Sequence, residues 1–112
     1  MVRVWCVPWV ALGRQRLLGQ HVEVHTLISV EAARVEGRRC GYQSHPEAVR
    51  YRGRLGELVD VHNGVAEEMQ RRGYNHHSPV TYPATPFTPT TEETRRDTIE
   101  LEKRQGAAAS LV

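Results

Sequence analysis

Apolar residues recur at helical spacing in two long stretches of the chain. The first stretch covers residues 14–36 and is followed by Gly37, a residue that commonly ends helices. The second covers residues 54–72 and is followed by Gly73. The spacing predicts two long amphipathic helices. Their apolar positions include Leu17, Val24, Ile28, Ala32 and Val35 in the first, and Leu55, Leu58, Val59, His62, Val65, Ala66 and Met69 in the second.

The remaining segments give weaker patterns. Residues 1–13 are rich in apolar side chains and contain Pro8, so we expect an extended, partly buried segment with Trp5 in the core. Ser44 stands three residues before Glu47, a capping-box spacing that predicts a short helix ending near Gly53. The Pro- and Thr-rich residues 78–91 predict irregular chain, laid on the surface or serving as a linker. Residues 91–107 predict a polar helix that frays or needs a partner, followed by a loose tail.

These elements together predict an all-α fold. With 112 residues and 39% hydrophobic residues, the chain can bury one small core. We expect a compact single domain with two long helices, a short helix between them, an extended N-terminal segment and an irregular C-terminal tail. The expected boundaries are a helical domain over residues 1–84 and a linker with a polar tail over 85–112. No stretch is long enough to span a membrane, and two unpaired cysteines favour a reducing, cytoplasmic setting.

The charge is unevenly distributed along the chain. Residues 1–90 hold 11 Arg and 8 acidic residues, a net charge of +3, whereas residues 91–112 hold 4 basic and 5 acidic residues, a net charge of −1. Lys103 is the single lysine of the sequence. Because arginine binds phosphates in a bidentate manner, this composition is compatible with nucleic-acid binding, although an Arg-rich solvated surface would give the same numbers.

Six histidines form the next candidate group. His21 and His25 are four residues apart and share a helix face, His62 lies on the apolar stripe of the second helix, and His76 and His77 follow that helix. We interpret them as polar groups of a half-buried cleft. The sequence has no H-E-x-x-H motif and no cysteine at metal spacing, so we predict no metal site and no cofactor. A metal-dependent enzyme using this cluster remains an alternative.

Glu23 and the start of the chain offer a second kind of chemistry. Glu23 lies in the middle of the first predicted helix, beside its apolar face. Val2 is small enough for Met1 to be removed, which would leave an α-amine with a pKa of about 7.7–8.0. A neutral amine can attack a sugar C1′ atom and form an imine. An exposed helix acid and an ordinary N-terminus are the plainer interpretations.

Several motifs resemble the pyrimidine-dimer DNA glycosylase family of the phage endonuclease V type. The match covers about residues 2–79 and is most similar to the short bacterial homologues. The motifs are Val2-Arg3-Val4, the run from Gln15 to Val24, the run from Leu55 to Tyr74, Gly41-Tyr42, His45-Pro46-Glu47 and His76-His77-Ser78-Pro79.

The resemblance implies a DNA repair glycosylase with abasic-site lyase activity on damaged double-stranded DNA. It places Val2 as the amine nucleophile and Glu23 as the catalytic acid. Candidate phosphate contacts are Arg3, Arg16, Arg71 and Arg72, and cleft polar groups are His21, His25, His62, His76 and His77. The expected protein is a monomer that acts in the cytoplasm at the nucleoid.

The sequence also departs from the phage-type pattern. Val2 replaces a hydroxyl residue, Val22 replaces an arginine that binds the DNA backbone, and a Thr/Pro-rich tail replaces an aromatic, basic C-terminus. These departures keep open a second alternative, a nucleic-acid-binding module that has the same fold without catalysis.

Overall fold

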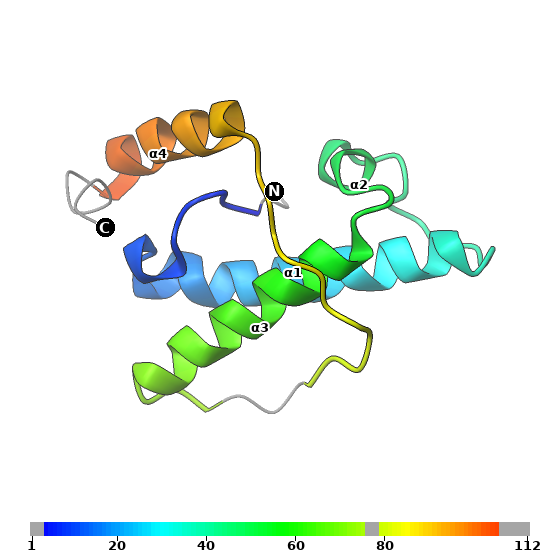
Figure 1. Cartoon of the computed structure of the whole chain (residues 1–112), viewed down its shortest axis with the longest axis horizontal. Coiled ribbons are helices and arrows are strands. Elements are labelled where there is room, and N and C mark those ends of the chain that lie inside the picture. The colour runs from blue at the N-terminus through cyan, green and yellow to red at the C-terminus, as the bar shows by residue number, and fades with distance from the viewer. Residues whose placement is uncertain (1–3, 76–78, 106–112) are drawn as a thin grey trace.

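Two long helices that cross each other form the centre of the molecule. The computed structural model describes residues 4–75 and 79–105, and the regular elements within them are all helical. Helices α1 (Arg14–Val35) and α3 (Leu55–Arg71) pack on each other, and the short α2 (Pro46–Arg50) lies between them in sequence (Figure 1). A 3₁₀ turn, η1 (Trp9–Ala11), precedes α1, and α4 (Thr91–Gln105) comes last. The predicted all-α class and helix arrangement are confirmed.

The ends of α1 and α3 lie within one residue of the predicted positions. Gly37 and Gly73 follow the two helices with φ angles of 72° and 85°. This left-handed conformation is strained for residues with a Cβ atom, so glycine ends both helices at little cost. The apolar stripe of each helix is buried against the other, and Leu17, Val24 and Leu58 are fully buried. Complete burial of such a side chain contributes about 1.5–3 kcal/mol.

The N-terminal segment is extended and buried, as predicted. Val4 to Val7 are at most 7% exposed, and Trp5 belongs to the core. Among residues 4–75 and 79–105 the segment has no neighbouring strand, and side chains from three helices accept hydrogen bonds from its backbone N–H groups. Val4 donates to Glu47 of α2, Trp5 to Gln20 of α1 and Cys6 to Asp97 of α4, over 3.0, 2.7 and 2.9 Å. These bonds satisfy backbone donors that would otherwise be buried without a partner.

The start of α2 differs from the predicted capping box. The N-cap residue is His45 rather than Ser44, and its Nδ1 accepts a 3.2 Å hydrogen bond from the backbone N–H of Glu47. The Glu47 carboxylate accepts from Val4 N and from the Arg50 guanidinium of its own helix, and not from the backbone of Ser44. The local cap is therefore made by His45, and Glu47 serves a tertiary contact.

Helix α4 is docked, not frayed, which corrects the expectation from its polar sequence. It presents few buried residues, but Asp97 and Leu101 are both 0% exposed. Asp97 binds the backbone of Cys6, and Leu101 belongs to the core. The residues before α4 run along the surface of α3, where Thr85 N and Phe87 N donate to α3. Figure 1 shows this segment crossing α3 on its way to α4.

Trp9 makes a close contact with α3 that requires a glycine. A Cβ atom at Gly64 would lie 2.5 Å from the Trp9 ring. The indole therefore packs directly on the helix backbone and fixes η1 against α3. Within the described residues, no helix combines the length and the apolar character needed to cross a membrane.

Candidate active site

Glu23 lines a pocket between α1, the N-terminal segment and α4. The pocket has a volume of about 280 Å³, and its wall includes Trp5, Gln20 and Arg104 as well as Glu23. The Glu23 side chain is half-buried, as its position beside the apolar stripe predicted. The structure therefore brings a carboxylate, an aromatic side chain and a cation to one hollow.

Gln20 joins the N-terminal segment to this pocket. It is 2% exposed, and its Oε1 accepts the hydrogen bond from Trp5 N. Its Nε2 is buried without a hydrogen-bond partner in the described structure. A buried donor of this kind costs about 1–3 kcal/mol when unsatisfied. Because Gln20 lines the pocket, a group bound there could accept this hydrogen bond.

Arginines surround the mouth of the pocket. Arg16 and Arg104 line it, and both also line an adjoining hollow of about 430 Å³ that includes Arg14. The Arg16 guanidinium is 3.3 Å from Gln105 Oε1, and the Arg104 guanidinium lies 5.5 Å from the centre of the Trp5 ring. Arg16 was expected at the site. Arg104 was not, because only the docking of α4 places it there, and its sequence neighbourhood gives no such signal.

Val2, the expected nucleophile, and the neighbouring Arg3 lie outside the described residues. The first described residue, Val4, is two positions from Val2, a length of chain that spans at most about 7 Å. The hydrogen bonds of Val4, Trp5 and Cys6 fix the segment that leads to the N-terminus.

A buried polar network supports this segment from the side of α2 and α4. Arg50 donates to the carboxylates of Glu47 and Glu93 over 3.0 and 2.6 Å, and its Nη2 lies 2.6 Å from Cys6 Sγ. Burial raises the pKa of the Cys6 thiol to about 11, although Arg50 opposes the shift. Burial also raises the pKa of Tyr51, whose hydroxyl is 3.8 Å from Cys6 Sγ. At neutral pH the thiol and phenol are therefore uncharged, and the arginine is neutralised by the two acids.

Arg71 and Arg72 have different surroundings despite being neighbours. Both donate to Glu68, but the Arg71 side chain is 62% exposed, whereas that of Arg72 is 18% exposed. Arg72 also donates to the carbonyl oxygens of Val10 and Leu12 over 3.3 and 2.7 Å. The Arg72 guanidinium holds the η1 region against α3, while Arg71 faces solvent.

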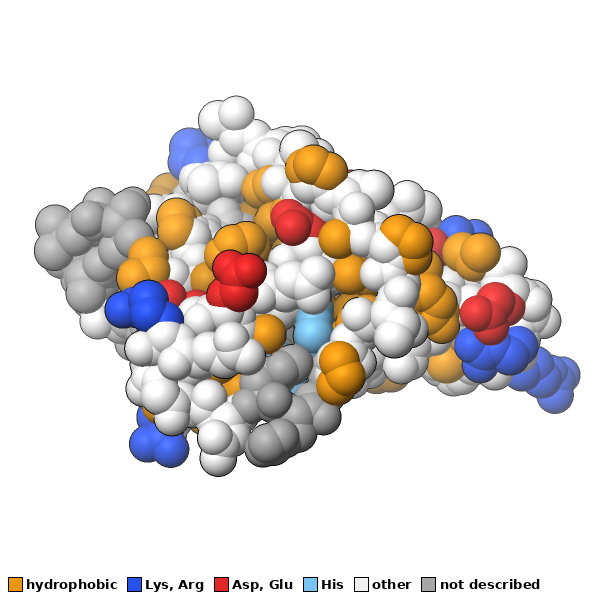
Figure 2. All heavy atoms as spheres, turned by 60° about the horizontal axis from the view of Figure 1, so that its bottom comes forward, with side chains coloured by type: hydrophobic (Ala, Val, Ile, Leu, Met, Phe, Trp, Pro, Cys, Tyr) orange, Lys and Arg blue, Asp and Glu red, His pale blue; other side chains and the backbone are white. Residues whose placement is uncertain are grey.

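On the face shown in Figure 2, Lys and Arg side chains are scattered and form no single patch.

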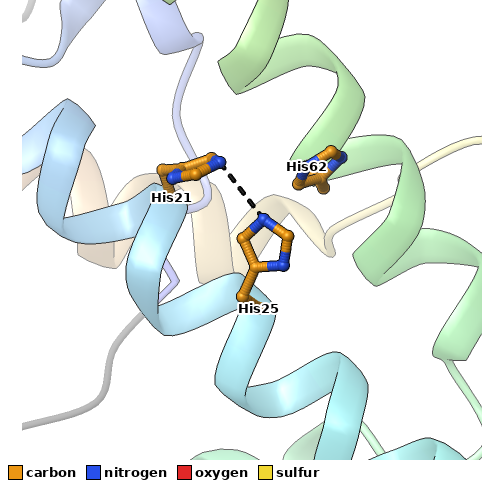
Figure 3. A group of neighbouring side chains, drawn as sticks. All are labelled: His21, His25 and His62. Carbon is orange, nitrogen blue, oxygen red and sulfur yellow. Dashed lines mark hydrogen bonds between the residues drawn. The ribbon is translucent and has the colours of Figure 1, made fainter. Parts of the chain in front are cut away.

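Three of the five expected cleft histidines converge. His21 and His25 of α1 and His62 of α3 surround one space, with His21 Nε2 and His25 Nε2 3.2 Å apart (Figure 3). His62 is 2% exposed, whereas His21 and His25 are half-buried. His76 and His77 lie outside the described residues. Sequence spacing predicted the shared face of His21 and His25, and the helix crossing adds His62.

Comparison with known proteins identifies the family of this fold and site. The family described as pyrimidine dimer DNA glycosylase matches residues 2–82, which is more than half of the chain. The chain belongs to the pyrimidine dimer DNA glycosylase family. The match spans the N-terminal segment and α1 to α3, and therefore includes Glu23 and Gln20. No match was found among curated proteins or among solved structures.

Membership of the pyrimidine dimer DNA glycosylase family supports a DNA repair glycosylase role and DNA as the substrate. Helix α4, with Arg104, lies beyond the matched residues. The pocket around Glu23 is thus lined by residues inside the family match and by Arg104, which lies outside it.

Proposed function

We propose that this protein acts on damaged double-stranded DNA as a monomeric glycosylase with abasic-site lyase activity, using its N-terminal amine. The nucleophile is the α-amine of Val2 after removal of Met1, and the acid is Glu23. The sugar–phosphate backbone of the damaged strand is bound by arginines around the pocket. The pocket of about 280 Å³ that Glu23 lines is the proposed site for the reacting sugar, and the resemblance implies that a base opposite the lesion is flipped out of the duplex.

The observation that carries this proposal is the position of the N-terminal segment beside α1. Trp5 N is bonded to Gln20, and Gln20 and Glu23 lie one helical turn apart on the wall of one pocket. Val2 precedes Trp5 by three residues, which span at most about 11 Å. This length of chain supports the proposal, because it is short enough for the amine to lie at the pocket that Glu23 lines.

The chemistry requires a nucleophile and one group that moves protons. The amine nitrogen attacks C1′ and the glycosidic bond breaks, so the base leaves with the bonding electrons and takes up a proton. The nitrogen loses a proton and the sugar ring opens as O4′ leaves C1′ and is protonated, which gives an imine. Loss of a C2′ proton then expels the 3′ phosphate by β-elimination, and water releases the amine. Glu23 stabilises the positive charge at C1′ and carries the C2′ proton.

The candidate arginines fit the role of phosphate contacts to different degrees, and Arg71 lines a separate hollow beside Trp9. Arg16, beside Glu23, and the exposed Arg71 offer accessible guanidinium groups, and Arg104 adds a third candidate. Arg72 is engaged with backbone carbonyls, so we assign it a structural role. Arg3 remains a candidate phosphate contact by its place next to Val2.

The test is borohydride trapping of the imine. The protein is incubated with duplex DNA that contains one abasic site or one pyrimidine dimer, reduced with borohydride, and examined by gel and by peptide mass mapping. Intact mass first establishes whether Met1 has been removed. Lys103 is the single lysine, so a Lys103→Arg chain removes the only competing side-chain amine. We expect a covalent adduct at the α-amine of Val2 in both chains.

Three outcomes would contradict the proposal. An adduct at Lys103 that disappears in Lys103→Arg would assign the chemistry to another amine. Salt-sensitive DNA binding without adduct or nicking would indicate a binding module. Nicking without an adduct, lost on chelation and restored by a divalent ion, would indicate a metal-dependent enzyme.

A further inference from the structure

The three histidines that converge between α1 and α3 form a group suited to a metal ion. One nitrogen from each ring, on His21, His25 and His62, lies within 4.8 Å of the others. The ring centres of His25 are 4.6 Å from those of both His21 and His62. Figure 3 shows the rings turned toward a common space, with two arising from α1 and one from α3.

The distances agree with the coordination of a small divalent ion. Zinc binds imidazole nitrogens at about 2.0–2.1 Å in tetrahedral geometry, which places ligand nitrogens roughly 3.3 Å apart. His21 Nε2 and His25 Nε2 already lie 3.2 Å apart. The third nitrogen, on His62, lies within 4.8 Å of the other two, so a shorter separation in the metal complex requires the ring to move toward them.

A neighbouring amide orients the buried member of the group. His62 Nδ1 lies 3.0 Å from Asn63 Oδ1. The amide oxygen can only accept, so this contact favours the tautomer with the proton on Nδ1, in which Nε2 is the ring nitrogen that carries the lone pair. Metal-binding histidines are commonly fixed in this way, by a hydrogen bond to the ring nitrogen that does not touch the ion.

One side of the histidine group is buried in the core, and the other side is partly exposed to solvent. His62 is 2% exposed and belongs to the core face of α3, while His21 and His25 are half-buried. An ion can therefore enter from solvent and bind where water competes poorly.

The group is separate from the Glu23 pocket. His21 and Glu23 are two positions apart on α1, which places them about 200° apart around the helix axis. Glu23 faces Trp5 and α4, whereas His21 faces α3. An ion held by the histidines would join the two long helices and would not touch the atoms that react beside Glu23.

We propose that His21, His25 and His62 bind one divalent transition-metal ion, with Zn²⁺ as the preferred ion. Three imidazoles without carboxylates or thiolates favour zinc, copper or nickel over magnesium or calcium. Three protein ligands leave a fourth position for water. Because the ligands come from α1 and α3, binding ties these helices together and stabilises the folded state.

The test uses the full chain without an affinity tag, stripped with chelator and then freed of it. Zn²⁺ is titrated by calorimetry and by competition with a chromophoric chelator, and Co²⁺ is added separately to observe its visible absorption. Thermal unfolding is followed with and without Zn²⁺. We expect one ion per chain, tetrahedral Co²⁺ bands without thiolate charge transfer, and a higher melting temperature with Zn²⁺.

Variants decide whether these three residues are the ligands. Loss of a group that merely orients a ligand weakens metal affinity by about 10–100-fold, so His21→Ala or His25→Ala should weaken it by at least about 100-fold. Circular dichroism of each metal-free variant checks that the half-buried positions tolerate the change. His45→Ala is the matched control, because His45 caps α2 away from the cluster. The control should bind as the unchanged chain does.

Other results would overturn the assignment. These are the absence of a one-to-one complex, an equal loss of affinity in His45→Ala, or binding that survives His25→Ala but is lost in a His76→Ala/His77→Ala chain. Imine trapping is measured independently of metal, so a failure of the metal site and a failure of the proposed lyase can be told apart.

Discussion

The backbone N–H of Trp5 donates a 2.7 Å hydrogen bond to Oε1 of the buried Gln20. This contact joins residues 15 positions apart and holds the N-terminal segment one helical turn from Glu23. It explains how a segment without a partner strand can be rigid. It also fixes the described start of the chain beside the α1 wall of the pocket that Glu23 lines.

Glu23→Gln should abolish most strand cleavage while DNA binding remains. The change preserves the size of the side chain and removes its ability to carry a proton, and general acid–base catalysis contributes about 10²–10⁴-fold. Cleavage of abasic duplex DNA under single-turnover conditions measures the rate, and a gel shift measures binding. Glu67→Gln, at an exposed position of α3, is the control. Unchanged cleavage in Glu23→Gln would refute the role of this carboxylate.

Arg72→Ala should destabilise the fold, and Arg71→Ala should change it little. Arg72 donates to two backbone carbonyls and to Glu68, and hydrogen bonds from a charged group contribute about 1.5–3 kcal/mol each when their partners are left buried. Arg71 shares Glu68 but is mostly exposed. Urea unfolding of both variants measures the difference. Equal stability of the two variants would show that the carbonyl contacts of Arg72 contribute nothing.

Glu68 should make stability depend on pH in the acid range. Hydrogen bonds from Arg71, and then from Arg72, lower the pKa of Glu68 from 4.5 to about 2. The folded state therefore favours the charged form, so this contribution is complete above about pH 4.5 and disappears as the pH falls toward 2.

Unfolding free energies of the unchanged chain and of Glu68→Gln should differ most near pH 6 and converge toward pH 2. Glu67→Gln, at the adjacent exposed position, should run parallel to the unchanged chain at every pH. A constant difference between Glu68→Gln and the unchanged chain would mean that Glu68 does not titrate as its arginine contacts require.

Leu101→Ala tests whether α4 is part of the core. Leu101 is 0% exposed, and replacement of such a leucine by alanine costs about 2–5 kcal/mol. Ile99 lies on the same helix but is 45% exposed, so Ile99→Ala should cost no more than about 0.5 kcal/mol. Chemical unfolding of the two variants measures both costs. Similar small losses would show that α4 is only loosely attached in solution.

The sequence by itself determined the local elements and the family. Helical periodicity fixed α1 and α3 because an apolar residue every three or four positions places one face toward the core, and the two glycines fixed their ends. The same local geometry put His21 and His25 on one face and Glu23 beside the apolar stripe. Motif resemblance indicated the glycosylase family, which the family match confirms.

Tertiary structure decided the contacts between segments that are distant in sequence. The angle at which α1 and α3 cross brings His62 to His21 and His25. Asp97 of α4 accepts a hydrogen bond from the buried N–H of Cys6, and this contact docks α4, although its sequence is mostly polar. The docking of α4 places Arg104 at the Glu23 pocket. Arg72 turns to the carbonyl of Leu12. The spacing of residues along one helix determines which of them share a face, but only the packing of the helices determines which other element covers that face.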